Sequence, residues 1–459
     1  MSILKPRSGN LLQNASFEAG LYFWQAENAG IANSSPAEGT QVAGLFAGVG
    51  SLYQIAPISP FLRRPLFLSF IAYAPEPAGS GSLTAEVLWL DSEFNVAGTG
   101  LRAVIPGSAI TNARITFFDV TDTPPVGAVW AKLLFSKGQS DLQVYLDLIN
   151  LTPVKTANLI QNPSFEYGLD NWAATGFVPG FSPVLEGGAA AASDLLSSSG
   201  SLIQTVSLRP VFPGAVYLLS FAFLSDVFPA QVFVRWLNIL GEPIGDPAID
   251  VEVSPVTLAQ QGNYLNIVQL TDKSPAGTAA ASIELGYSNN AAAAAALDQV
   301  LFIRLDSPNL LLNPGFAAGL DEWTSEGAAI VGTGAYVGAN YAGLSADGAF
   351  IHQTVELPVL AISGSFLFNF ALRFGGADAA NGSVLAQVHW LDRNGLEIGL
   401  AASLNVAQTV QTREQWQVYT AFTEKPPISA AYARIQFTKS QGAALTDIGL
   451  DSVTFAKVT

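Results

Sequence analysis

The chain repeats one pattern three times. Residues 10–24 read NLLQNASFEAGLYFW, residues 158–172 read NLIQNPSFEYGLDNW, and residues 309–323 read NLLLNPGFAAGLDEW. Later segments keep the same register as far as a closing strand that carries Leu-Asp in every copy. The copies start 148 and 151 residues apart, and a domain usually takes about 100–200 residues. The repeat therefore predicts an N-terminal arm (1–9) followed by three modules, at 10–154, 158–308 and 309–459.

The repeated segments are typical of β-strands. They are short, rich in Val, Ile, Leu, Phe, Tyr and Trp, and separated by clusters of Gly, Pro, Asn, Asp and Ser. No long window has the period of an amphipathic helix. This pattern predicts an all-β fold of three tandem jelly-roll-like β-sandwich domains. The linkers are very short, which favours a stiff rod or a compact trimer of modules within one chain.

Composition excludes several classes of function. Only 12% of residues are charged, against about 25% in an average protein, and the formal net charge is −16. Nucleic acid and anionic membrane surfaces are therefore poor partners. The chain has no cysteine, which excludes disulfides, thiolate metal sites and cysteine nucleophiles. No apolar run is long enough for a spanning helix, and the N-terminal charges are not followed by the apolar stretch of a classical signal peptide.

The opening motif N-L-x-x-N-x-x-F-E-x-G, with Asp in the closing strand, resembles the galactose-binding-like β-sandwiches of carbohydrate-binding modules. It is also similar to spore-surface domains of endospore-forming bacteria. The first resemblance implies a structural calcium ion, held by Glu18 with Asp147 in module 1 and by Glu166 with Asp298 in module 2. Module 3 keeps Asp451 but has Ala317 in place of the glutamate, so calcium is expected in modules 1 and 2. The alternative is that these acids cap turns or accept buried backbone hydrogen bonds.

Candidate ligand contacts come from positions that differ among the copies. Six tryptophans recur in all three modules and are expected in the core, whereas Trp130 and Trp416 do not recur. Strand alternation in the middle strand turns Glu86, Arg235 and His389 outward, on faces that differ in charge. We expect any ligand contact from these five side chains, and the varied faces argue against one shared sugar site.

The sequence predicts a protein that is not an enzyme. It lacks the nucleotide-binding, zinc-protease and serine-hydrolase motifs, and no acidic pair recurs in all three modules. The low charge indicates apolar surface that another subunit covers. We therefore expect a structural protein that self-assembles on a bacterial surface, spore coat, exosporium or appendage, and reaches it without a classical signal peptide. The alternative is a carbohydrate-binding protein that attaches to polysaccharide.

Overall fold

A computed structural model describes residues 9–458 apart from short gaps in loops and strand ends. The gaps are at 34, 75–80, 141–142, 181–182, 210–211, 226–228, 255–256, 258–262, 289–293, 359–360, 377–381, 409–413 and 441–445. Most of the predicted N-terminal arm, residues 1–8, lies outside the described residues. The regular structure is almost entirely β-strand, with one 3-10 turn, η1 (Ala361–Ser363), so the all-β prediction is confirmed. No helix in the described part of the chain is long and apolar enough to span a membrane.

The strands fall into three sets of ten in chain order. The first set is β1 (Gln25–Glu27), β2 (Ala29–Ala32), β3 (Val42–Leu45), β4 (Gly50–Pro57), β5 (Leu66–Tyr73), β6 (Leu83–Leu90), β7 (Val96–Ile105), β8 (Ile115–Val120), β9 (Trp130–Lys137) and β10 (Val144–Pro153). The second is β11 (Ala173–Thr175), β12 (Phe177–Gly180), β13 (Ala190–Ser193), β14 (Ser199–Ser207), β15 (Val216–Ser225), β16 (Ala230–Leu237), β17 (Ile249–Val253), β18 (Leu265–Leu270), β19 (Ala280–Ser288) and β20 (Ala295–Leu305). The third is β21 (Thr324–Glu326), β22 (Ala328–Val331), β23 (Tyr341–Leu344), β24 (Phe350–Glu356), β25 (Phe366–Gly376), β26 (Ser383–Leu391), β27 (Glu397–Ala407), β28 (Trp416–Phe422), β29 (Tyr432–Lys439) and β30 (Thr446–Lys457).

Each set forms a sandwich of two five-stranded antiparallel sheets. In module 1, sheet A has the order β1-β4-β9-β6-β7 and sheet B the order β2-β3-β10-β5-β8, and the other modules repeat both orders. Alternating side chains fill the space between the sheets. Trp89, Trp236 and Trp390 of the middle strand are buried there, as the sequence predicts. The β-sandwich prediction is thus confirmed in all three copies.

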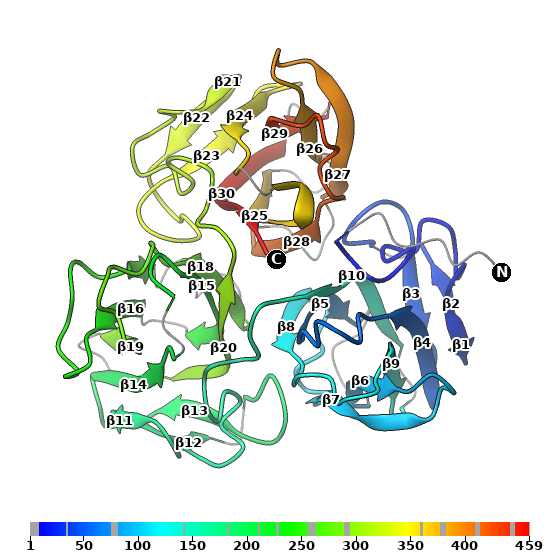
Figure 1. Cartoon of the computed structure of the whole chain (residues 1–459). Helices are drawn as coiled ribbons and strands as arrows, with labels where there is room; N and C mark the ends of the chain where they lie inside the picture. The colour runs from blue at the N-terminus through cyan, green and yellow to red at the C-terminus, as the bar shows by residue number, and fades with distance from the viewer. Residues whose placement is uncertain are drawn as a thin grey trace.

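The three sandwiches surround a central axis rather than forming a rod. Figure 1 shows β8, β18 and β28, the edge strands of the three B sheets, converging at the centre. Thr116 Oγ1 donates a hydrogen bond to Val418 O at 2.8 Å, and Gln417 Nε2 donates to Thr116 Oγ1 at 2.6 Å. Asn266 Nδ2 donates to Thr116 O, and Tyr336 Oη donates to Asn266 O at 2.6 Å. Side chains from all three modules therefore satisfy the carbonyls that face the axis.

Equivalent backbone contacts close the ring. Gly187 N of module 2 donates to Val104 O of β7 in module 1 at 2.6 Å, and Gly338 N of module 3 donates to Glu252 O of β17 in module 2 at 3.0 Å. Gly39 N of module 1 donates to Asn405 O of β27 in module 3 at 2.9 Å. The same loop thus docks on the same strand at each of the three interfaces. A head-to-tail contact that relates successive modules by a third of a turn produces a closed ring after three modules. The chain is therefore a compact trimer of modules.

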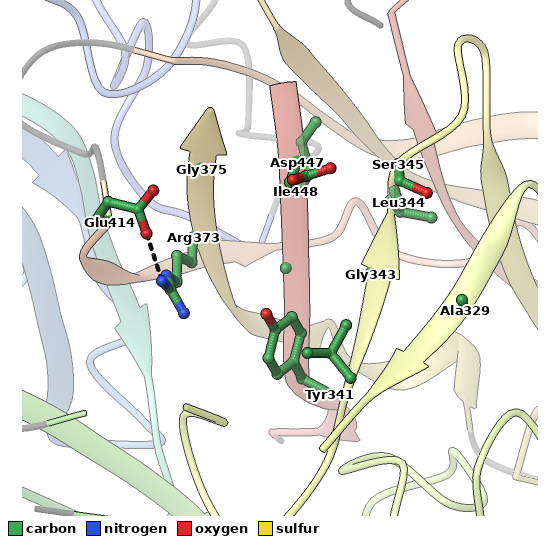
Figure 2. Close-up of a pocket in the computed structure, with 12 residues that line it drawn as sticks. Ala329, Tyr341, Gly343, Leu344, Ser345, Arg373, Gly375, Glu414, Asp447 and Ile448 are labelled. Atoms are coloured by element: carbon green, nitrogen blue, oxygen red, sulfur yellow. Dashed lines mark hydrogen bonds and ion pairs between the residues drawn. The ribbon is translucent and has the colours of Figure 1, made fainter. Parts of the chain in front are cut away.

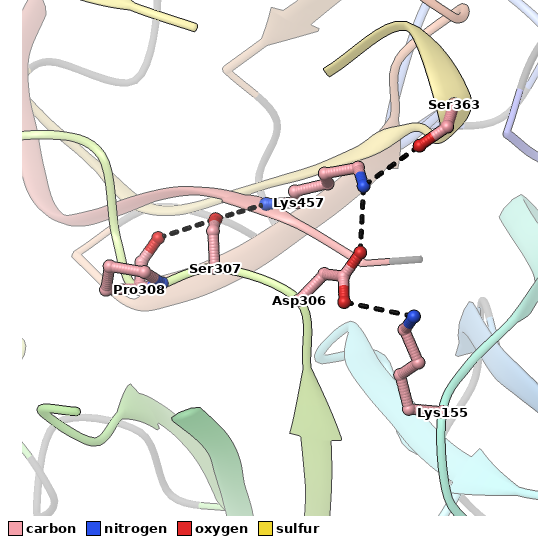
Figure 3. A network of polar contacts seen from close by, with 6 residues as sticks. All are labelled: Lys155, Asp306, Ser307, Pro308, Ser363 and Lys457. Atoms are coloured by element: carbon pink, nitrogen blue, oxygen red, sulfur yellow. Dashed lines mark hydrogen bonds and ion pairs between the residues drawn. The ribbon is translucent and has the colours of Figure 1, made fainter. Parts of the chain in front are cut away.

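The linkers between modules meet in one polar network (Figure 3). Asp306, between modules 2 and 3, lies 3.0 Å from Lys155 Nζ and 2.8 Å from Lys457 Nζ, and Lys457 Nζ also donates to Ser363 Oγ at 3.2 Å. Partial burial opposes ionisation of Asp306, but hydrogen bonds from the two lysines outweigh it and lower the pKa of this carboxyl. The network joins the first linker, the second linker and the last strand.

Asp306→Asn is expected to lower the free energy of unfolding by roughly 1 kcal/mol at pH 7, because it removes two partly exposed ion pairs. The folded state lowers the Asp306 pKa, so its contribution is present above the ordinary carboxyl pKa and is lost as pH falls through the folded pKa. The wild-type and variant proteins should therefore converge in urea titrations near pH 2. Asp170→Asn, at an exposed turn, is the control; an equal difference at pH 7 and pH 2 would contradict the prediction.

Candidate functional site

The closing-strand acids that the sequence assigned to calcium accept backbone hydrogen bonds. Asp147 is fully buried, with Oδ2 accepting from Ala37 N at 2.8 Å and Glu38 N at 3.0 Å and Oδ1 accepting from Leu148 N at 2.8 Å. Asp298 and Asp451 repeat this clamp in modules 2 and 3. Burial raises the pKa of all three carboxyls, to about 8 for Asp298, although the amides oppose the shift. The clamp recurs even where the glutamate is absent.

The opening-motif glutamates also accept backbone hydrogen bonds, but they are exposed. Glu18 Oε1 accepts from Thr40 N at 2.8 Å and Gln41 N at 2.9 Å, and Glu166 Oε1 accepts from Gly188 N at 2.8 Å. In the described residues, no group of three or more His, Asp or Glu side chains is placed to hold a metal ion. Backbone N–H groups already donate to these carboxylates. A calcium ion needs about six to eight oxygen ligands around it, and N–H groups cannot supply them, so the two pairs fit a calcium site poorly. Calcium binding by these two pairs stays a prediction.

Removal of calcium tests that prediction. An ion that binds the folded chain alone stabilises it by mass action. Calcium on Glu18 with Asp147 and on Glu166 with Asp298 would make the melting temperature of the full chain fall on chelation. The Glu18→Gln and Glu166→Gln variants should then each lose part of this sensitivity. A chelator response that both variants keep in full would remove the assignment.

The outward side chains of sheet A are paired with neighbouring strands. Arg102 Nε lies 3.1 Å from Glu86, Arg235 Nη1 lies 3.0 Å from Glu284, and His389 Nδ1 lies 2.9 Å from Glu397. These pairs join different residue types in the three modules. The structure thus agrees with the prediction that Glu86, Arg235 and His389 point outward, and it does not bring them together, since each lies on a separate module.

The two unrepeated tryptophans have opposite environments. Trp130 lies on the outer face of sheet A in module 1, half-buried, with its ring stacked on exposed Phe94 at a centroid distance of 5.3 Å. Trp416 of β28 is only 3% exposed; it contacts Tyr336 and Tyr341, and its indole N–H donates to Gly334 O at 2.9 Å. The prediction of an exposed contact is therefore wrong for Trp416. That residue is part of the ring's packing.

A hollow of about 310 Å³ lies on the outer face of sheet B in module 3. Figure 2 shows Tyr341 on one side of it, Asp447 on another, and the Arg373–Glu414 ion pair at its end. The alternation of each strand explains the arrangement. Ala342, Leu344, Ile448 and Leu450 point into the core, so the residues between them on β23 and β30 point outward.

Two glycines and an arginine form the floor of this hollow. Gly343 pairs with Gly449, and Gly449 pairs with Arg373 on the next strand, so no side chain rises above the first two positions. A Cβ at Gly449 would lie 2.8 Å from Tyr341 and 3.0 Å from Trp416. The equivalent positions are Gly44, Tyr145 and Tyr73 in module 1, and Ala192, Ala296 and Leu224 in module 2. In the other copies, Tyr145 and Ala296 therefore stand where module 3 has Gly449.

The lining combines opposite polar functions. Arg373 supplies donors, Glu414 and Asp447 supply acceptors, and Tyr341 supplies an aromatic ring with a hydroxyl. Burial raises the pKa of Tyr341, with the neighbouring arginine opposing the shift, so the hydroxyl stays protonated at neutral pH. The sequence interpretation missed all four residues. Glycine at both 343 and 449 was the available signal, but it becomes visible only when the strand register is known.

No family model matches the chain, and no curated protein sequence matches it. Several solved structures are similar. The tandem CBM22 domains of Paenibacillus barcinonensis Xyn10C align at 15% identity and a TM-score of 0.25, covering 66% of this chain and 98% of that chain. TmCBM61 in complex with β-1,4-galactotriose aligns at 20% identity and a TM-score of 0.26, covering 33% of this chain and 99% of that chain.

Other matches belong to larger proteins. The enzymatically active domain of bacteriophage CBA120 tailspike protein 4 aligns at 17% identity and a TM-score of 0.27, covering 32% of this chain and only 21% of that chain. The similar structures are mostly carbohydrate-binding modules, as the opening motif indicated; similarity to spore-surface domains stays a prediction. At such identities and TM-scores, the likeness assigns no ligand or activity to this chain.

Proposed function

We propose that the protein is a non-catalytic carbohydrate-binding protein whose ligand site is the hollow in module 3. The observation that carries this proposal is the hollow itself: about 310 Å³, with an aromatic ring and convergent donors and acceptors on a sheet. Small-molecule sites are concave, largely pre-formed and oriented by a few polar groups. Sheet B also holds these groups rigidly, since its inner face is core.

The balance of charge selects the class of sugar. Two carboxylates and one guanidinium line the hollow, so the site carries a net negative charge. Uronic acids and sulfated sugars would be repelled. A neutral, hydroxyl-rich glycan can donate to Asp447, accept from Arg373 and lie against Tyr341. Glu414 is engaged in an ion pair with Arg373 at the end of the hollow.

The ring also changes the argument for self-assembly. The low charge led us to expect apolar surface covered by a second chain, but much of that surface is buried between modules. One core cluster includes Phe67 and Phe118 of module 1, Phe302 of module 2 and Phe422 of module 3. Self-association remains the second candidate, because Phe94, Leu240 and Leu396 are exposed at equivalent hairpin tips. Assembly on a spore or cell surface stays a prediction.

Tyr341→Ala in the full chain is expected to weaken glycan binding about tenfold, because it removes the aromatic wall of the hollow. The measurement is a glycan array followed by calorimetry with the best neutral oligosaccharide. Trp130→Ala is the matched control, since it removes an aromatic from the outer face of module 1. The control should bind like the wild-type protein.

Two results would contradict the proposal. Loss of binding in Trp130→Ala, with Tyr341→Ala unaffected, would move the site to sheet A of module 1. A protein that binds no glycan and forms regular multimers at micromolar concentration would favour the structural function.

A further inference from the structure

A small void lies between modules 1 and 2, away from the proposed sugar site. Its volume is about 40 Å³, and its polar lining includes Asp119 of β8 from module 1 and Glu186 and Gln299 from module 2. Gly187 N, next to Glu186, is tied to β7 of module 1. The void is therefore part of the ring contact itself. Neither Asp119 nor Gln299 belongs to the calcium pairs that the opening motif implied.

The polar side chains around this void offer more hydrogen-bond acceptors than the surrounding residues offer donors. Glu186 is 9% exposed, and Gln299 Nε2 donates to its Oε2 at 3.2 Å. Gln299 is 6% exposed, and its Oε1 has no hydrogen-bond partner among the described residues. Asp119 Oδ1 accepts from Val120 N at 2.7 Å. Burial, and the repulsion between the two carboxyls, raise the pKa of Glu186, and burial raises that of Asp119 to about 7.

We propose that this void binds a divalent cation of the calcium class, held by Asp119, Glu186 and Gln299 Oε1. Hard cations of this kind take carboxylate and amide oxygens. A cavity needs about 10–15 Å³ of space on this measure to hold one water molecule, so the void has room for a cation. The ion would neutralise the carboxylates of partly buried Asp119 and buried Glu186, and it would coordinate the unpartnered amide oxygen of Gln299. Because its ligands come from two modules, it would fasten the interface between modules 1 and 2.

The pseudo-threefold ring supplies an internal comparison. At the interface of modules 2 and 3 the equivalent residues are Gln269, Val337 and Ser452, and at the interface of modules 3 and 1 they are Ala421, Glu38 and Leu148. Glu38 has no opposing acid, and its Oε1 instead accepts from Asn405 N at 3.1 Å. Three oxygens therefore face one void at the first interface alone. A cation site that is present at only one of the three equivalent interfaces would produce this difference in side chains.

The test is calcium chloride titration of the chelator-treated full chain, by calorimetry and by thermal melting. Asp119→Asn should bind one calcium ion fewer than the wild-type protein and lose the calcium-dependent rise in melting temperature. At a calcium concentration 100 times the dissociation constant, the folded-to-unfolded ratio of the wild-type protein should rise about 100-fold. Glu38→Gln, at the equivalent position without an opposing acid, should respond like the wild-type protein.

Without calcium, Asp119→Asn should be at least as stable as the wild-type protein, because one of two apposed carboxylates is gone. A variant that has merely lost structure would instead melt lower in both conditions, and Gln299→Leu then gives a second measurement with no change of charge. Calcium bound at Glu18 or Glu166 would persist in Asp119→Asn, so the difference in stoichiometry isolates this site. The same stoichiometry and calcium response in wild-type, Asp119→Asn and Gln299→Leu proteins, or no calcium binding by the wild-type chain, would overturn the proposal.

Discussion

Asp451→Ala is expected to lower the free energy of unfolding of module 3 by about 3–5 kcal/mol. The carboxylate is fully buried and accepts from Tyr336 N at 3.0 Å, Val337 N at 3.2 Å and Ser452 N at 2.6 Å. Alanine leaves three buried amides without an acceptor, and each unsatisfied donor costs about 1–3 kcal/mol. The same loop carries Gly338, which docks on module 2, so the interface should loosen as well.

Differential scanning calorimetry of the full chain measures this effect, since a multi-module protein need not unfold in one step. Asp451→Asn keeps the volume and one acceptor oxygen, so its loss should be intermediate. Asp447→Ala, on the same strand but exposed, is the control and should melt like the wild-type protein. An Asp451→Ala protein with an unchanged melting profile would show that the clamp does not stabilise the module.

The sequence was sufficient to predict the sandwiches because their determinants are local and repeated. Alternation along the middle strand buries Trp89 and its equivalents, and that pattern is legible without a structure. The closing Asp stands out in the sequence because it recurs in every copy, but its function is open at that level. A buried carboxylate that accepts amides and one that binds calcium have the same sequence pattern, and only the positions of the surrounding N–H groups distinguish them.

The ring could not be predicted in the same way, because its contacts differ among modules. Trp416 does not recur, and for that reason the sequence made it a candidate ligand contact. It is buried because it packs against Tyr336 and Tyr341 in the core cluster that spans the modules. A residue unique to one copy can thus belong to packing between copies. Likewise, the low charge indicated apolar surface that needs a partner, but composition does not tell whether that partner is another chain or another module of the same chain.

The hollow and the void depend on register across strands. Gly343, Gly449 and Arg373 come from three strands separated by long stretches of sequence. Asp119 and Glu186 come from different modules. Neither set has a spacing that a motif search would recognise. Strand pairing brings the residues of the hollow together, and contact between two modules brings together those of the void.

Deleting module 3 is expected to cause the largest loss of stability, because the ring then has two open faces. Phe67 loses its edge contact with Phe422, at a centroid distance of 5.8 Å, and Thr116 loses both Gln417 and Val418. Burying apolar surface contributes about 25 cal/mol for each Å², so the exposed faces favour unfolding or association. A chain ending at Ser307 should melt well below the full protein or aggregate, as followed by melting and light scattering.

A circular permutant is the matched control, because it cuts the same ring without removing an interface. Gly9 N donates to Thr423 O at 2.9 Å and Val458 N donates to Ser365 O at 3.0 Å, while Gly9 lies directly against the Ser365 side chain. The ends of the described chain therefore meet on module 3, so a short linker can join them. With new ends opened beside Lys155, the permutant should keep all three contacts and stay monomeric, with a modest loss from the linker ion pairs. If the two-module chain instead melts as a monomer at the temperature of the full protein, the modules are independent and the closed ring contributes nothing to their stability.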